Sequence, residues 1–177
     1  MGFQRKVLRQ DDAAAVQDSQ TDFAPLPVDI YRVKIVEVLE PEDDEGGSYK
    51  VTFEVEKGIK TGVTNATRKI IEYMTSPRPD MKDGGQFCER RLAVFGIACG
   101  LFTAAEFAEG KVAELTDAED KVILVRTKHS KRIVDGVEKT YTNVDGMHMY
   151  ARDDAKMAEL INKAKGAKKA DDKFKAL

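Results

Sequence analysis

The sequence predicts a mainly β fold, in which five short strands form a small barrel with helices between the third and fourth strands and a C-terminal helix. Three observations predict it. Apolar and polar residues alternate in several short segments, as in half-buried strands. After the third such segment the apolar period becomes helical. Near the end, Asp135-Gly136 is the signature of a tight hairpin, so the last two strands are expected to be antiparallel neighbours.

The first three strands are expected before residue 75. Residues 30–39 are rich in β-branched side chains and follow the turn-forming Pro25-Leu26-Pro27. Residues 49–56 alternate strictly, and residues 67–74 follow after a polar loop. Three aromatic residues in these strands are predicted to lie in the core: Tyr31, Tyr49 and Phe53.

The next segment is predicted to be helical. From Gln86 the apolar residues follow a helical period, and Gly100 stands where a glycine commonly ends a helix. Thr103 and Glu106 have capping-box spacing, which predicts a second short helix ending at Gly110. The apolar face of the first helix is predicted to contain Phe87, Leu92, Phe95 and Cys99.

Residues 121–128 are predicted to form the fourth strand, and residues 140–144 belong to a fifth. The C-terminal helix is predicted from four apolar residues at helical spacing, Met157, Leu160, Ile161 and Ala164.

The chain therefore divides into a flexible segment (1–22), one binding domain (23–152), and a helix with a Lys-rich tail (153–177). The apolar face of that helix is a candidate surface for homo-oligomer formation.

The composition fits a cytoplasmic protein. The 29 Lys and Arg residues nearly balance 31 Asp and Glu, so any nucleic-acid site must come from a local basic patch. Two cysteines and two histidines without metal-ligand spacing predict no metal or cofactor. No apolar run reaches membrane-spanning length, so no membrane partner is expected.

Residues 23–58 contain FAPLPVDIYRVKIVEV, an acidic turn with two glycines, and YKVTFEVEKG. This arrangement resembles a family of small phage-encoded proteins long catalogued as a domain of unknown function. The likeness extends over about residues 23–150, with a Gly-Lys-Val strand start at 110–112 and a Tyr-x-Asn element at 141–143. Family members often have an aromatic-rich third strand, whereas Tyr73 is the single aromatic residue of 67–74.

The resemblance implies an oligonucleotide-binding (OB) barrel that binds single-stranded DNA beside phage replication or recombination proteins in the host cytoplasm. The predicted element order agrees, since an OB barrel has five strands and binds through the loops between strands one and two and between strands four and five.

A basic stretch at residues 121–152 is the first candidate surface, because it contains seven cations and only three carboxylates. Single-strand binders combine such charges with aromatic rings that stack on bases. The acidic turn at residues 40–45 would repel phosphate, and Arg90-Arg91 is interpreted as a solvated helix face. The candidate binding residues are Lys50, Arg68, Lys69, Tyr73 and Arg78 from the second and third strands and the next loop, and Arg126, Lys128, Lys131, Arg132, Lys139 and Tyr141 from the last two strands.

An enzyme is not expected, because no phosphate-binding glycine motif and no recognisable catalytic grouping is present. The remaining enzymatic alternative is a Mg²⁺-dependent nuclease that uses Asp43, Asp44 and Glu45. The main alternative is a protein-interaction module on the same barrel without nucleic-acid binding.

Overall fold

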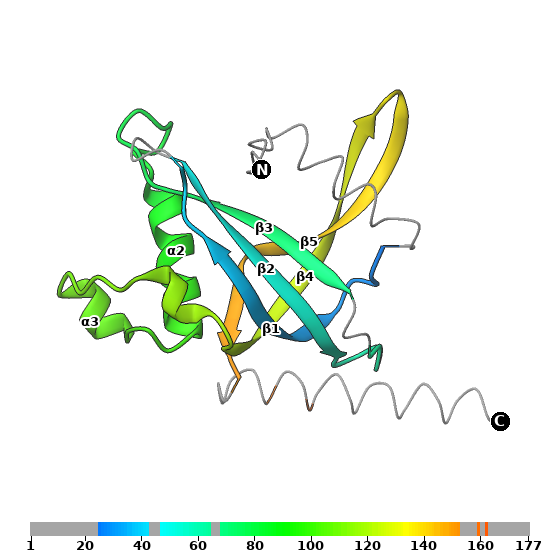
Figure 1. Ribbon diagram of the computed structural model, residues 1–177, viewed down its shortest axis with the longest axis horizontal. Helices are drawn as coiled ribbons and strands as arrows, with labels where there is room; N and C mark the ends of the chain where they lie inside the picture. Colours follow the sequence, from blue (N-terminus) through cyan, green and yellow to red (C-terminus); the bar gives the residue numbers. More distant parts are fainter. Residues whose placement is uncertain (1–24, 43–46, 65–67, 153–158, 160–161, 163–177) are drawn as a thin grey trace, which may run out of the picture.

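The computed structural model describes residues 25–42, 47–64 and 68–152, together with Glu159 and Asn162. These residues form one antiparallel sheet in the order β3-β2-β1-β4-β5 (Figure 1). The mainly β class with five strands is thus confirmed. The strands are β1 (Ile30–Leu39), β2 (Ser48–Gly58), β3 (Lys69–Thr75), β4 (Val122–Val134) and β5 (Val137–Ala151).

Two α-helices and a 3₁₀ helix connect β3 to β4, namely α2 (Gln86–Ala98), α3 (Ala104–Ala108) and η1 (Leu115–Ala118). Gly100 follows α2 with a φ of +71°, where a side chain would be strained. The capping box predicted at Thr103 and Glu106 is present. The 3₁₀ helix was not predicted, and the Gly-Lys-Val segment at 110–112 is irregular rather than the start of a strand.

One residue was misplaced in the predicted helix face, because Phe87 in the first turn of α2 is exposed. The core side of α2 contains Phe95 instead, whose ring meets that of Phe53 edge-on with centroids 6.4 Å apart. Tyr31 and Phe53 are fully buried and Tyr49 packs against the core, as predicted. The predicted flexible segment at 1–22 and almost all of the C-terminal helix and tail lie outside the described residues.

The sheet does not close into the predicted barrel. Among the described residues no backbone pairing joins β3 to β5, so both remain edge strands. A side chain bridges them instead: the buried carboxylate of Glu72 on β3 accepts a hydrogen bond from the Val144 amide on β5. The same carboxylate forms an ion pair with Arg91 of α2 at 2.8 Å. Glu72 therefore links β3 to both β5 and α2 at the place where the sheet remains open.

The end of the sheet extends into a hairpin that we call the arm, residues 127–144. β4 pairs with β1 only from Val122 to Arg126, and beyond that point it pairs with β5 alone. Figure 1 shows the arm rising away from the other strands. The predicted strands at 121–128 and 140–144 were too short. The turn was predicted correctly, with Asp135 and Gly136 at φ +52° and +76°.

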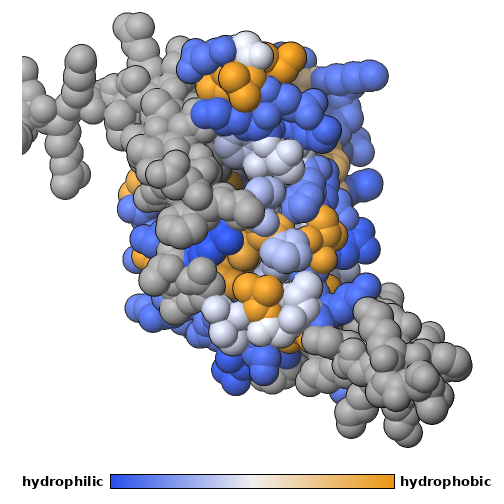
Figure 2. Space-filling model, turned by 90° about the vertical axis from the view of Figure 1, so that its right-hand side faces the viewer, coloured by the Kyte–Doolittle hydropathy of each residue, from blue (hydrophilic) through white to orange (hydrophobic). Residues whose placement is uncertain are grey.

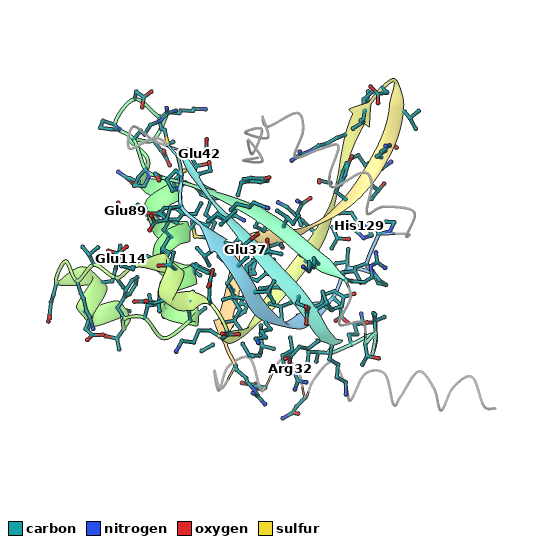
Figure 3. The ribbon with its side chains drawn as sticks, viewed as in Figure 1. Arg32, Glu37, Glu42, Glu89, Glu114 and His129 are labelled. Atoms are coloured by element: carbon teal, nitrogen blue, oxygen red, sulfur yellow. The ribbon has the colours of Figure 1, made fainter. Side chains whose placement is uncertain are left out.

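The base of the arm is braced by the segment that precedes β1. The Leu26 carbonyl oxygen accepts hydrogen bonds from His129 Nε2 at 2.7 Å and from Thr142 Oγ1 at 3.1 Å. The Thr127 amide donates to the Asp29 carbonyl at 2.9 Å. Figure 3 shows His129 beside this segment. Since a two-stranded hairpin is marginally stable by itself, these bonds fix the direction of the arm.

Candidate nucleic-acid interface

Strand alternation gives the arm two faces of different chemistry. Cross-strand partners lie on the same face of a sheet, and successive residues point to opposite faces. One face, which we call the basic face, contains Arg126, Lys128, Arg132, Lys139, Tyr141 and Asn143 with the carboxylate of Asp145. The other contains His129, Lys131, Ile133, Glu138, Thr140 and Thr142. The predicted cluster is therefore divided, with Lys131 facing away from its neighbour Arg132.

Arg132 lies on the part of the basic face nearest the tip of the arm. Its guanidinium carbon is 5.9 Å from the centroid of the Tyr141 ring, within the range of a cation–π interaction. Its direct cross-strand partner is Lys139. Two cations therefore stand side by side on this face of the arm.

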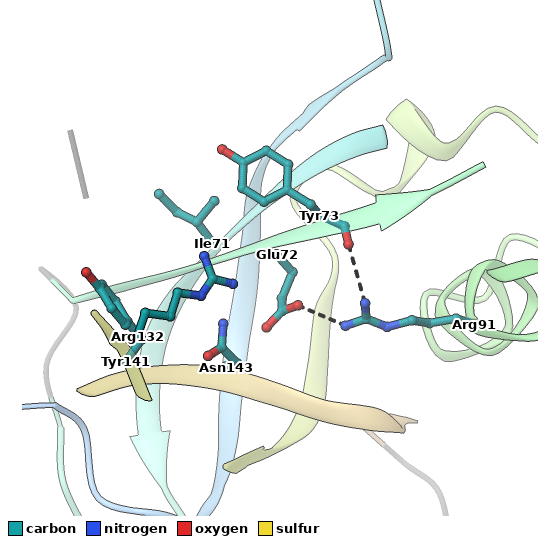
Figure 4. A pocket seen from close by; sticks show the side chains of 7 residues that line it. All are labelled: Ile71, Glu72, Tyr73, Arg91, Arg132, Tyr141 and Asn143. Carbon is teal, nitrogen blue, oxygen red and sulfur yellow. Dashed lines mark hydrogen bonds and ion pairs between the residues drawn. The ribbon is translucent and has the colours of Figure 1, made fainter. Parts of the chain in front are cut away.

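A pocket of about 230 Å³ opens between the basic face and β3. Figure 4 shows Arg132, Tyr141 and Asn143 on the side of the arm, with the β3 residues opposite them. Tyr73 is 39% exposed, whereas the Tyr141 side chain is largely buried in the pocket wall. Three predicted residues from distant parts of the sequence thus meet here. The complete lining is Ile71, Glu72, Tyr73, Arg91, Arg132, Tyr141 and Asn143.

The ion pair of Glu72 and Arg91 forms the inner end of the pocket (Figure 4). The Arg91 side chain is only 16% exposed, and it also donates to the carbonyl oxygens of Gly146 at 3.2 Å and Tyr73 at 3.4 Å. Interpreting Arg91 as a solvated residue was therefore wrong. Because this pair satisfies its own charges, the guanidinium of Arg132 is the more accessible cation of the pocket.

Asp145 restrains two predicted cations of the basic face. Its Oδ2 accepts hydrogen bonds from Arg126 Nε at 2.8 Å and Nη2 at 2.6 Å, and its Oδ1 lies 3.8 Å from Lys128 Nζ. Burial alone would raise the pKa of Asp145, but the Arg126 guanidinium, together with His148 and Lys128, holds it below its ordinary value. The carboxylate therefore remains charged at neutral pH and competes with any phosphate for these two side chains.

The other predicted cations are not among the residues that line the pocket. Lys131 pairs with Glu138 at 2.8 Å on the opposite face of the arm, and Lys50 on β2 lies 3.4 Å from Glu37. Figure 3 shows Glu37 over the outer side of β1 and β2. Lys69 is exposed on β3, Arg68 immediately precedes it, and Arg78 pairs with Asp80 at 3.4 Å in the loop after β3.

In the part of the chain that the structure describes, no group of three or more His, Cys, Asp or Glu side chains comes together as a metal site requires, and residues 43–46, with the proposed Mg²⁺ ligands, lie outside this part. Within the same part, no helix has the length and apolar character needed to cross a membrane. Comparison with known proteins found neither a protein-family model nor a curated sequence that matches this chain.

Proposed function

We propose that this protein binds single-stranded DNA with little sequence preference, in support of phage DNA replication or recombination. The observation that carries the proposal is the basic face, where four cations stand against one carboxylate and lead into a pocket with two tyrosines. Single-strand binders need both parts, since cations neutralise phosphates and aromatic rings stack on bases without reading their edges.

The strand order gives independent support for an OB-type architecture. β1 pairs with both β2 and β4, while β3 and β5 lie at the two ends of the sheet. This is the order of a five-stranded OB barrel opened between its third and fifth strands, a fold that is often only partly closed. In such barrels ligands lie across the second and third strands beside the loop joining strands four and five, and the pocket between β3 and the arm has that position.

The direct test is a fluorescence-anisotropy titration of labelled oligo-dT at two salt concentrations, with duplex DNA and single-stranded RNA as competitors. Tight binding that weakens with salt and resists duplex competition is expected. Absence of binding at low salt would overturn the proposal and favour the protein-interaction module.

Two adjacent residues make a matched test of the site. Arg132→Ala removes a cation from the basic face and should weaken oligo-dT binding about fivefold to tenfold, since it contributes to both phosphate contact and stacking. Lys131→Ala removes the same charge from the opposite face and should leave the affinity within about twofold. Equal losses in both variants would refute the assignment of the site to the basic face.

A further inference from the structure

The tip of the arm carries exposed apolar side chains. Ile133 is 78% exposed and Val137 is 58% exposed, on either side of the Asp135-Gly136 turn. Figure 2 shows hydrophobic surface surrounded by hydrophilic residues at the upper end of the molecule, where Figure 1 places the tip. Single exposed apolar residues are common on proteins, but Val137 lies directly opposite Val134 on the basic face at the end of a projecting hairpin, whereas Ile133 points to the other face.

The paired cations Arg132 and Lys139 lie directly behind this apolar tip. They are two positions along the strands from the last cross-strand pair, Val134 and Val137. At about 3.3 Å of rise per residue, the charged pair lies about 7 Å behind the last apolar pair. An anionic ligand that holds the two cations therefore brings an adjoining apolar group within reach of the tip.

Nucleic acid offers this combination, because apolar base faces lie next to charged phosphates. Proteins that insert apolar side chains into a duplex must first unstack neighbouring base pairs. The last base pair of a duplex differs, since one of its faces is already exposed. A boundary between duplex and single strand thus presents an apolar surface without unstacking, together with phosphates on both sides.

We infer that the arm tip recognises the junction between duplex and single-stranded DNA. Val134 and Val137 pack on the exposed face of the terminal base pair, while Arg132 and Lys139, on the same face of the arm, contact the flanking phosphates. The single strand then runs along the basic face into the pocket. This inference rests on the proposed single-strand binding. It adds a second class of ligand, duplex DNA with a single-stranded tail.

The test compares three labelled ligands by anisotropy: oligo-dT, a blunt duplex, and the same duplex with an oligo-dT tail. The full-length protein should bind the tailed duplex about tenfold more tightly than oligo-dT alone, which corresponds to about 1.4 kcal/mol. The double variant Val134→Thr, Val137→Thr should lose this preference and retain its affinity for oligo-dT. Threonine keeps the β-branched shape, and a melting curve verifies that the fold is intact.

Val112→Thr is the matched control, since Val112 is 87% exposed in the loop before η1, and it should behave as the parent protein. Equal affinity of the parent for tailed duplex and oligo-dT, or an unchanged preference in the double variant, would overturn the inference alone. Failure to bind any of the three ligands would overturn the proposed function. A change from dimer to monomer in the double variant would show that a second copy covers the tip, which also overturns the inference.

Discussion

Neutralising Asp145 should strengthen the binding of single-stranded DNA. In Asp145→Asn the amide keeps the size of the side chain but releases Arg126 and Lys128 from their carboxylate partner. Each ion pair between partly exposed side chains contributes about 0.2–1 kcal/mol, so losing the competition for two cations should raise affinity about twofold to thirtyfold at low salt. The salt dependence gives a sharper number. Each phosphate neutralised on a single strand adds about 0.7 to the logarithmic salt slope, so two released cations should steepen it by about 1.4.

The assay is oligo-dT anisotropy from about 50 to 200 mM salt, over which a slope change of about 1.4 multiplies the loss of affinity about sevenfold. Glu138→Gln is the matched control, because Glu138 forms a comparable ion pair with Lys131 on the opposite face of the arm. It should change neither affinity nor slope. If Asp145→Asn binds no more tightly than the parent protein, or if Glu138→Gln gives the same gain, the basic face is not the phosphate-binding surface.

Three further outcomes follow from the contacts described above. Glu72→Gln should lower the free energy of unfolding in urea by about 3 kcal/mol, because it leaves the largely buried Arg91 without its counter-charge, and a midpoint equal to that of the parent would contradict this. Burial raises the pKa of the Cys99 thiol to about 12, so this thiol should react with a thiol reagent at pH 8 only after the protein unfolds. Two fast-reacting thiols in the native protein would refute the burial of Cys99. The salt bridge with Lys111, helped by the backbone amide and hydroxyl of the capping residue, lowers the pKa of Glu106 to about 2. The charged Glu106 carboxylate should therefore stabilise α3 fully above the ordinary pKa of 4.5, and this stabilisation should be lost as pH falls towards 2. A titration of the Glu106 carboxyl NMR shift tests this.

The parts of the fold that could be predicted are those in which one face of an element is buried. β1 was predicted with its observed bounds, because an alternating strand with one buried face leaves a readable pattern. The arm was underestimated because the β4 side chains beyond Thr127 are exposed or half-buried, so apolar alternation stops while the strand continues. At residues 145–148 extra residues of β5 interrupt the register between the Thr127–Val144 and Val125–Met149 pairs. Such a bulge removes the period on which the prediction of a strand depends.

The candidate site was predicted in composition and only partly in arrangement. The charges at 126–132 were correctly identified as a cluster in sequence, but alternation places Lys131 opposite to Arg132. The predicted strand ended at residue 128, so the alternation that separates Lys131 from Arg132 could not be applied to them. The meeting of Tyr73 with Tyr141 was beyond sequence reasoning, since it depends on how the sheet curves to bring its two edges together.

The position of Glu72 in the sequence could have predicted where β3 contacts α2 and β5. It lies between Ile70 and Met74 on the inward side of β3, so alternation predicts a buried carboxylate. A buried carboxylate requires a cation and hydrogen-bond donors, and Arg90-Arg91 lies within the helix that follows. The acid therefore implied that α2 returns to the edge of β3, where Arg91 in fact contacts it. The amide of Val144 provides the second donor, because the opened sheet leaves the edge of β5 without a strand partner beside β3. One misfit in a hydrophobic pattern thus marks the position where helix, edge strand and arm converge on the candidate site.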